Sequence, residues 1–390
     1  MFKSNLNSIK FASLLCYLLP LALLSGPFLP DLIISLVSII FIYISIREKL
    51  IKFYQSYFFI IFSIFYIYIL ISSLNSEFYL HSLESSFFYF RFGFFALAIW
   101  FLIERNNNFL KNFTIIFSLT FLLAIIDSYY QFYNDTNMFG IYTLQSNRLT
   151  LLFNDKTYLG GYLSRLTPLL IGLVILISNN KKISYLLISI CLILVDVSVY
   201  LSGERTAIGL LLVGSLFIIL LMREFRMIRV VSLTLSIIII VIISIANPII
   251  KERNIDKTIN QVFNQKQGKI AIFSITHESH FFTAYKMFKA KPILGHGPNT
   301  FRVVCSESLY EYNDLSCSTH PHNIYIQILA ETGLIGILIF LIIPASLLYI
   351  TLLHIKSYFL LGNKILNDAQ ICFLGAILLT LFPFFPTQNF

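Results

Sequence analysis

Histidine chemistry is concentrated in one short stretch of the chain. The segment CSTHPHNIYIQILAETGLIG (317–336) places His320, His322 and Asn323 directly before a long apolar run. A histidine whose pKa lies near neutrality can take a proton from an attacking hydroxyl group. Polar groups are expensive at the edge of an apolar helix, so this segment is a candidate site rather than a plain connector.

Basic side chains recur at the ends of other apolar runs. The members of this set are Arg91, Arg148, Lys156, Arg165 and Arg205. A guanidinium group matches phosphate oxygens in a bidentate way and stays charged in a partly dry site. Arginines beside a histidine base predict group transfer from a lipid-linked phosphate donor. For Lys156 and Arg165, contact with lipid headgroups is an equally open interpretation.

A polar stripe follows the histidines. Asn323, Gln327 and Glu331 are spaced by four residues, so they share one face of the expected helix. We expect this stripe to line the wall of a cavity that holds the substrate. The alternative is hydrogen bonding between helices. Asp196 lies inside another apolar run. It either lines a polar path through the membrane or forms an ion pair with a neighbouring arginine.

Other kinds of site fit the sequence less well. The two-residue spacing of His320 and His322 does not place both rings on one helix face. A zinc site needs further ligands, and the stretch THESH offers His277, Glu278 and His280. The stretch GHGPNTF lacks the lysine of a phosphate-binding loop, and no GxSxG is present. We therefore expect neither metal nor cofactor.

The composition determines the class of protein. Of the 390 residues, 57% are hydrophobic and 12% are charged, and the mean hydropathy is +0.80. Soluble domains carry about 25% charged residues. The chain is predicted to be an all-α, polytopic integral membrane protein in contact with membrane lipids. The net charge of +9 reflects basic residues that flank apolar runs, so we expect no nucleic-acid partner.

Apolar runs long enough to cross a membrane predict about eleven spans. They are 11–29, 31–46, 57–74, 86–103, 110–130, 157–178, 183–201, 206–222, 230–247, 324–353 and 368–385. They divide the chain into an N-terminal membrane bundle (1–247), one large loop between the ninth and tenth spans (248–322), and C-terminal membrane helices (323–390).

Lysine and arginine concentrate in every second short loop, which predicts a cytoplasmic N-terminus. Arg223, Arg226 and Arg229 are assigned to one of these cytoplasmic loops. The large loop then lies on the outer, periplasmic side. Cys305 and Cys317 fall in that loop, where an oxidising compartment permits a disulfide. Two free thiols are the alternative.

The motifs as a group resemble the O-antigen ligase and O-antigen polymerase family of bacterial envelope glycosyltransferases. The most specific stretch is KPILGHGPNTFRVVC…CSTHPHNIYIQILAETGLIGILIF (291–340). SGERTA (202–207) is similar to the arginine-bearing turn of the family. Weaker similarity covers 126–140, 147–168 and FYFRFG (88–93).

The resemblance implies a function at the periplasmic face of the bacterial inner membrane. An undecaprenyl-pyrophosphate-linked glycan would be the donor, and a hydroxyl of lipid A–core or of another glycan would be the acceptor. The reaction would be inverting and independent of metal. His322 would be the base, Arg205 and Arg148 would bind pyrophosphate, and Asn323 would orient the imidazole.

The sequence also departs from the family pattern. His277 and His280 stand in a region where family members often carry an arginine, so His280 is a candidate substrate contact. Family members usually continue from a segment like FPFFPTQNF into another membrane helix, so the resemblance leaves open whether this sequence is truncated at its C-terminus. The same motifs fit an O-antigen polymerase or a protein O-oligosaccharyltransferase. A membrane transporter is the alternative from another class, although no internal repeat is visible.

Overall fold

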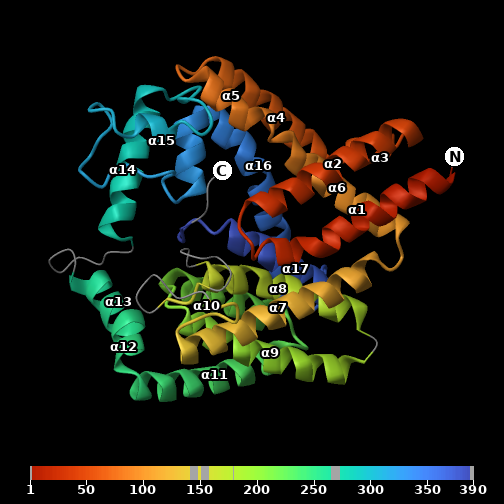
Figure 1. The fold of residues 1–390 in the computed structure, drawn as a ribbon, viewed down its shortest axis with the longest axis vertical. Coiled ribbons are helices and arrows are strands. Elements are labelled where there is room, and N and C mark those ends of the chain that lie inside the picture. Colours follow the sequence, from red (N-terminus) through yellow and green to blue (C-terminus); the bar gives the residue numbers. More distant parts are fainter. Residues whose placement is uncertain (1, 141–147, 151–157, 179, 265–272, 387–390) are drawn as a thin grey trace.

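The computed structural model describes residues 2–140, 148–150, 158–178, 180–264 and 273–386 (Figure 1). Within these ranges the chain is helical and contains no strand. Asp155 and the candidate Lys156 lie outside the described residues.

The element bounds are as follows. The α-helices are α1 (Phe2–Ala22), α2 (Phe28–Glu48), α3 (Ile51–Tyr54), α4 (Tyr57–Leu74), α5 (Tyr79–Phe87), α6 (Phe90–Arg105), α7 (Phe109–Asn134), α8 (Leu159–Ile177), α9 (Lys181–Leu201), α10 (Arg205–Leu221), α11 (Arg226–Ala246), α12 (Pro248–Lys251), α13 (Lys257–Ile259), α14 (Ile275–Ala290), α15 (Phe301–Val304), α16 (Ile324–Leu361) and α17 (Asp368–Thr380). Two π-helical turns, η2 (Glu252–Asp256) and η3 (Asn260–Asn264), extend α12 and α13.

Among the described residues, eight helices are long and apolar enough to cross a membrane. Three shorter apolar helices, Leu6–Ala22, Arg205–Leu221 and Asp368–Thr380, coincide with other expected spans. The chain is thus a multi-pass membrane protein with an all-helical fold. The count of eleven spans and the sidedness of the loops stay predictions.

The helices form two groups around α16 (Figure 1). Helix α2 packs on α1 and α6, while α8 packs on α7, α9, α10 and α17. Helix α16 contacts both α4 and α14, so it joins the first group to the α14–α15 part of the large loop.

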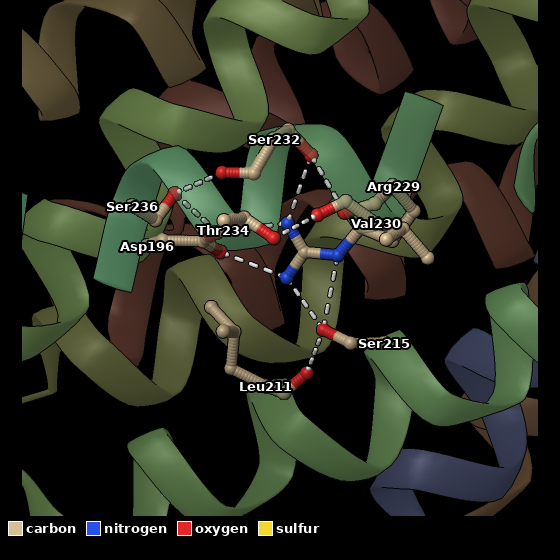
Figure 2. Close-up of polar contacts among 8 residues, drawn as sticks. All are labelled: Asp196, Leu211, Ser215, Arg229, Val230, Ser232, Thr234 and Ser236. Atoms are coloured by element: carbon tan, nitrogen blue, oxygen red, sulfur yellow. Dashed lines mark hydrogen bonds and ion pairs between the residues drawn. The ribbon is translucent and has the colours of Figure 1, made fainter. Parts of the chain in front are cut away.

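One buried ion pair joins α9, α10 and α11 (Figure 2). Arg229 donates to both carboxylate oxygens of Asp196 at 2.8 and 2.9 Å, and both side chains are 2% exposed. Ser215 accepts from the same guanidinium group, and Ser236 donates to Asp196 at 2.8 Å. Each charge is therefore paired and hydrogen-bonded, which is the condition under which a charge is tolerated in an apolar interior.

This ion pair decides one open question and corrects one assignment. Asp196 forms a structural pair, so the ion-pair interpretation is confirmed. Arg229 was assigned to a cytoplasmic loop, and that assignment was wrong, because the residue lies within α11 and is 1% exposed. A count of basic residues by position along the sequence cannot distinguish a loop arginine from one a single turn inside a helix.

Breaking this pair on one side should destabilise the protein strongly. Asp196→Ala leaves the Arg229 guanidinium buried without its carboxylate, and such changes typically cost about 3–5 kcal/mol. Asp196→Leu combined with Arg229→Met should recover much of the loss, because both charges are then removed. Thermal unfolding in detergent measures this. Glu104→Ala, which breaks the exposed pair with Lys52, should change little.

Candidate functional site

Helix α16 is broken near its start by a glycine. Gly333 has φ +65° and ψ −167°, which interrupts the helical hydrogen-bond ladder. An added Cβ at this glycine would lie 2.3 Å from the carbonyl oxygen of Ile293, so only glycine permits both the turn and the contact. The break frees backbone groups that must find other partners.

The large loop supplies those partners. The N–H groups of His296 and Gly297 donate to the carbonyls of Ala330 and Glu331 at 3.2 and 2.7 Å. In return, the N–H of Leu334 donates to the carbonyl of Pro292 at 2.8 Å. The GHG and ETG motifs, which lie far apart in the sequence, are thus two halves of one joint between the loop and α16.

The carboxylate of Glu331 fixes the next part of the loop. It accepts from the backbone N–H groups of Asn299 and Phe301, both at 3.0 Å, and from the amide of Gln327 at 3.2 Å. Gln327 and Glu331 are fully buried. The expectation that these two residues line a substrate cavity was wrong, because they face the folded loop and hold it against α16.

Asn323 begins α16. Its side-chain oxygen accepts from the N–H groups of Tyr325 and Ile326 at 3.0 and 3.2 Å, and its amide donates to the carbonyl of Pro383. Asparagine is a favoured residue at this capping position. His322, directly before the cap, has φ +58°, a backbone conformation that is uncommon for a non-glycine residue. The side chain of Asn323 is therefore engaged in capping instead of contacting the imidazole.

Four imidazole rings gather in front of the α16 N-terminus. The ring centre of His322 lies 4.2 Å from that of His320, 5.3 Å from that of His277 and 5.5 Å from that of His280. His277 and His280 come from α14, while His320 and His322 come from the segment before α16. A disulfide between Cys305 and Cys317 closes the loop just ahead of that segment. We call these four residues the histidine cluster.

The histidine cluster favours uncharged imidazoles. Burial, followed by the charges of neighbouring histidines, lowers the pKa of His277 and of His280 to about 4. Burial alone lowers the pKa of His322 below its usual 6.5. The lowered pKa of His322 favours its free-base form at neutral pH.

A second polar group surrounds the turn between α9 and α10. The Glu204 carboxylate accepts from the N–H groups of Gly160 and Gly161, at 2.7 and 3.0 Å, at the start of α8. Burial raises the pKa of Glu204 to about 7, against the opposing effects of these bonds and of Arg148 and Arg165. The carboxylate thus ties α8 to the turn that presents Arg205.

Arg205 has arginine neighbours. Burial, followed by the positive charges of Arg148 and Arg205, lowers the pKa of Arg253. Arg253 lies in η2 and donates to the carbonyl of Gly203 at 3.3 Å. Arg148, Arg165, Arg205 and Arg253 therefore form one arginine cluster around Glu204. The sequence reasoning missed Arg253, because it lies in the charged stretch KERNIDK, which carries no periodic signal.

A short segment after α17 joins the two clusters. Asn323 donates to the carbonyl of Pro383 at 2.9 Å, and Arg165 donates to that of Pro386 at 3.0 Å. The ring of Phe385 lies against Gly209, one helical turn after Arg205. Three residues of chain span at most about 11 Å, so the two clusters lie near each other. Figure 1 shows this segment between α16 and the α8–α10 helices.

Arg91 belongs to neither cluster in its contacts. It donates to Asp31 at 3.1 Å and to the carbonyl of Phe88 at 2.8 Å, and its guanidinium group lies over the ring of Phe92. These interactions hold the start of α6 to α2. Among the described residues, no group of three His, Cys, Asp or Glu side chains has the geometry to hold a metal ion.

A comparison with protein-family models finds a match over the segment that contains most of the candidate site. The family model for O-antigen ligase matches residues 187–341. The chain carries an O-antigen ligase domain. The resemblance seen in the motifs is thereby confirmed over residues 187–341, and the matched family comprises glycosyltransferase-like enzymes of lipopolysaccharide biosynthesis. No curated protein matches the chain.

The O-antigen ligase domain contains the whole histidine cluster, the disulfide, the broken part of α16, and Arg205 with Arg253. Arg148 and Arg165 lie outside the match, yet they come to the same place through the Glu204 turn. The site therefore draws on residues from both sides of the boundary of the matched segment.

Substitution at the joint between the large loop and α16 should reveal what this contact contributes to the free energy of unfolding. Gly333→Ala combines an unfavourable positive φ with the clash against Ile293, so it should destabilise by several kcal/mol. Gly362→Ala is the matched control, since Gly362 also has φ +67° but no atom within 4 Å. It should cost roughly 1–2 kcal/mol. Equal unfolding temperatures for the two variants would contradict this account of the joint.

Proposed function

We propose that the chain is an O-antigen ligase that transfers a glycan from undecaprenyl pyrophosphate to a hydroxyl of lipid A–core. The reaction would take place at the periplasmic face of the inner membrane. The single observation that carries this proposal is the connection of the two clusters through residues 383–386. It supports one site with an anion-binding side and a base side.

The histidine side would activate the acceptor. His322 is half-buried and its lowered pKa keeps it neutral at physiological pH. It takes the proton of the acceptor hydroxyl as that oxygen attacks the anomeric carbon of the donor sugar. The new glycosidic bond forms while the bond to pyrophosphate breaks, with inversion at the anomeric carbon. Asn323 serves this step indirectly, by fixing the start of α16.

The arginine side would bind the donor and stabilise the leaving group. The departing undecaprenyl pyrophosphate carries the electron pair of the broken bond, so negative charge grows on its phosphate oxygens. Arg205, Arg148 and Arg253 are held in advance around the Glu204 turn, and preorganised charges of this kind contribute strongly to catalysis. Arg165, bonded to Pro386, would keep this side at a fixed distance from His322.

The acceptor distinguishes this function from that of a polymerase, which would use the same donor. Envelope polysaccharide from cells that lack the gene should accumulate carrier-linked polymer, because ligation is lost. Accumulation of single repeat units would instead assign the chain to a polymerase. The transporter alternative has less support, because Asp196, Gln327 and Glu331 are buried in internal hydrogen bonds.

Variants of the two clusters test the mechanism. Purified protein in lipid nanodiscs, with undecaprenyl-pyrophosphate-linked glycan and lipid A–core, should lose transfer with His322→Ala. Arg205→Ala and Arg253→Ala should each lower kcat by about 10²–10³-fold, since a charge-stabilising donor is removed. Arg105→Ala is the matched control and should leave transfer unchanged. Arg105 lies at the C-terminal end of α6, is paired with Glu48 and belongs to neither cluster. Full activity of His322→Ala would refute the role of the base.

The pH dependence follows from the direction of the pKa shift. A base works in its deprotonated form, and burial lowers the pKa of His322 below 6.5. Transfer should therefore be constant near pH 7 and decrease as the pH falls through a midpoint below 6.5. The pH profile of kcat/KM measures this limb. A midpoint above 7 would show that the imidazole is stabilised in its charged form, contrary to the burial argument.

A further inference from the structure

Two imidazole rings from α14 lie beside the ring of His322. Two imidazole rings joined by an N–H···N bond of about 2.9 Å have ring centres roughly 5 Å apart. The separations from His322 to His277 and His280, 5.3 and 5.5 Å, are close to this value. The ring of His320 lies closer, at 4.2 Å, and is tilted by 54° to that of His322.

His280 has a nitrogen available for such a bond. The residue is 3% exposed, and its Nδ1 atom is buried without a hydrogen-bond partner among the described residues. A buried nitrogen of this kind loses its contacts with water and gains nothing in return. His277 differs, because its Nδ1 is already engaged with the hydroxyl of Ser274 at 3.1 Å.

We propose that His280 is a positioning residue that orients His322 and accepts a hydrogen bond from it when His322 becomes protonated. Catalytic histidines commonly rely on a second group that holds the ring and stabilises the imidazolium. Asn323, the residue first expected in this role, caps α16 with its oxygen and binds Pro383 with its amide. An uncharged imidazole from α14 fills the role in its place.

The transfer of the acceptor's proton to His322 leaves no proton unaccounted for. The acceptor O–H bond breaks, and its proton forms a new N–H bond on one ring nitrogen of His322. The other ring nitrogen of His322 carries an N–H that donates to His280 Nδ1, so no further proton has to leave the pair. His280 remains neutral throughout, in the tautomer with its proton on Nε2.

The charged groups around the pair are few. On α14, Glu278 lies between the two histidines in sequence, and Arg302 follows Phe301, whose ring centre lies 6.5 Å from that of His280. On α16, the carboxylate of Glu331 is taken up by the loop backbone. The shifts of His280 and His322 have burial as their first cause, and none of these three side chains contributes to them.

Two substitutions of His280 distinguish positioning from packing. His280→Phe keeps the ring volume but removes both nitrogens. His280→Asn loses volume but retains an acceptor near the position of Nδ1. If the role is positioning, the Asn variant should keep at least tenfold more kcat than the Phe variant, because loss of a supporting hydrogen bond typically lowers activity 10–100-fold. If the residue only fills space, the order should reverse.

The pH profile provides an independent readout. Because His280 stabilises the protonated form of His322, its loss should lower the apparent pKa of the base. The acid limb of kcat/KM should therefore move to lower pH in His280→Phe and return toward wild type in His280→Asn. The KM for the lipid-linked donor should stay unchanged in both variants, since the arginine cluster is intact.

His296→Phe is the matched control. His296 is also a buried loop histidine, 4% exposed, but it bonds to the carbonyl of Met287 and packs against Tyr310, outside the histidine cluster. It should leave the pH limb in place. The inference rests on His322 being the base, and His322→Ala separates the two ideas. If that variant is inactive while His280→Phe is as active as His280→Asn, the inference on His280 falls and the proposed function stands.

Discussion

The joint between the large loop and the broken helix α16 is the constraint on which the rest of the site depends. Gly333 interrupts the helix, and the freed carbonyls of Ala330 and Glu331 accept from the loop at His296 and Gly297. Beside a lipid bilayer such groups have no water to bond, so the loop has to dock there. Helix α14 ends at Ala290, just before the residues of the loop that form the joint, and α16 begins just after His322. Both halves of the histidine cluster are therefore held by the same joint.

Buried charge serves two separate parts of the molecule. Glu331 is fully buried and accepts three hydrogen bonds, which fix the loop. Asp196 and Arg229 form a bidentate pair among serines, which fixes α9, α10 and α11. In each case the hydrogen-bond partners stabilise a buried charged group, and removal of a partner would leave that group unsatisfied. The first interaction positions the imidazoles, while the second positions the helices that carry Arg205 and lead to Arg253.

The sequence was sufficient to predict the membrane class and the similarity to the O-antigen ligase family. His322 and Arg205 stand out because rare residue types interrupt the ends of apolar runs. The sequence was not sufficient for Gln327 and Glu331, because four-residue spacing defines a shared face but not whether that face meets water or polypeptide. Arg253 reaches Gly203 across fifty residues of chain, and no local pattern reports such a contact. Asparagine is a favoured residue at a helix N-cap, so the capping role of Asn323 was also compatible with the sequence. Its position beside His322 suggested instead that it orients the imidazole.

The segment after α17 connects the arginine cluster to the start of α16. Its contacts with the two clusters are made by the carbonyls of Pro383 and Pro386, which accept from Asn323 and Arg165. Proline has a fixed φ and no N–H, so a segment of this kind is stiff and accepts hydrogen bonds without competing for acceptors. The distance between the arginine side and the histidine side is therefore set by a short rigid element, not by the large loop alone. The segment fixes the arginine side relative to the Asn323 cap of α16. The loop joint fixes the α14 histidines relative to the same helix, so two separate elements converge on the start of α16.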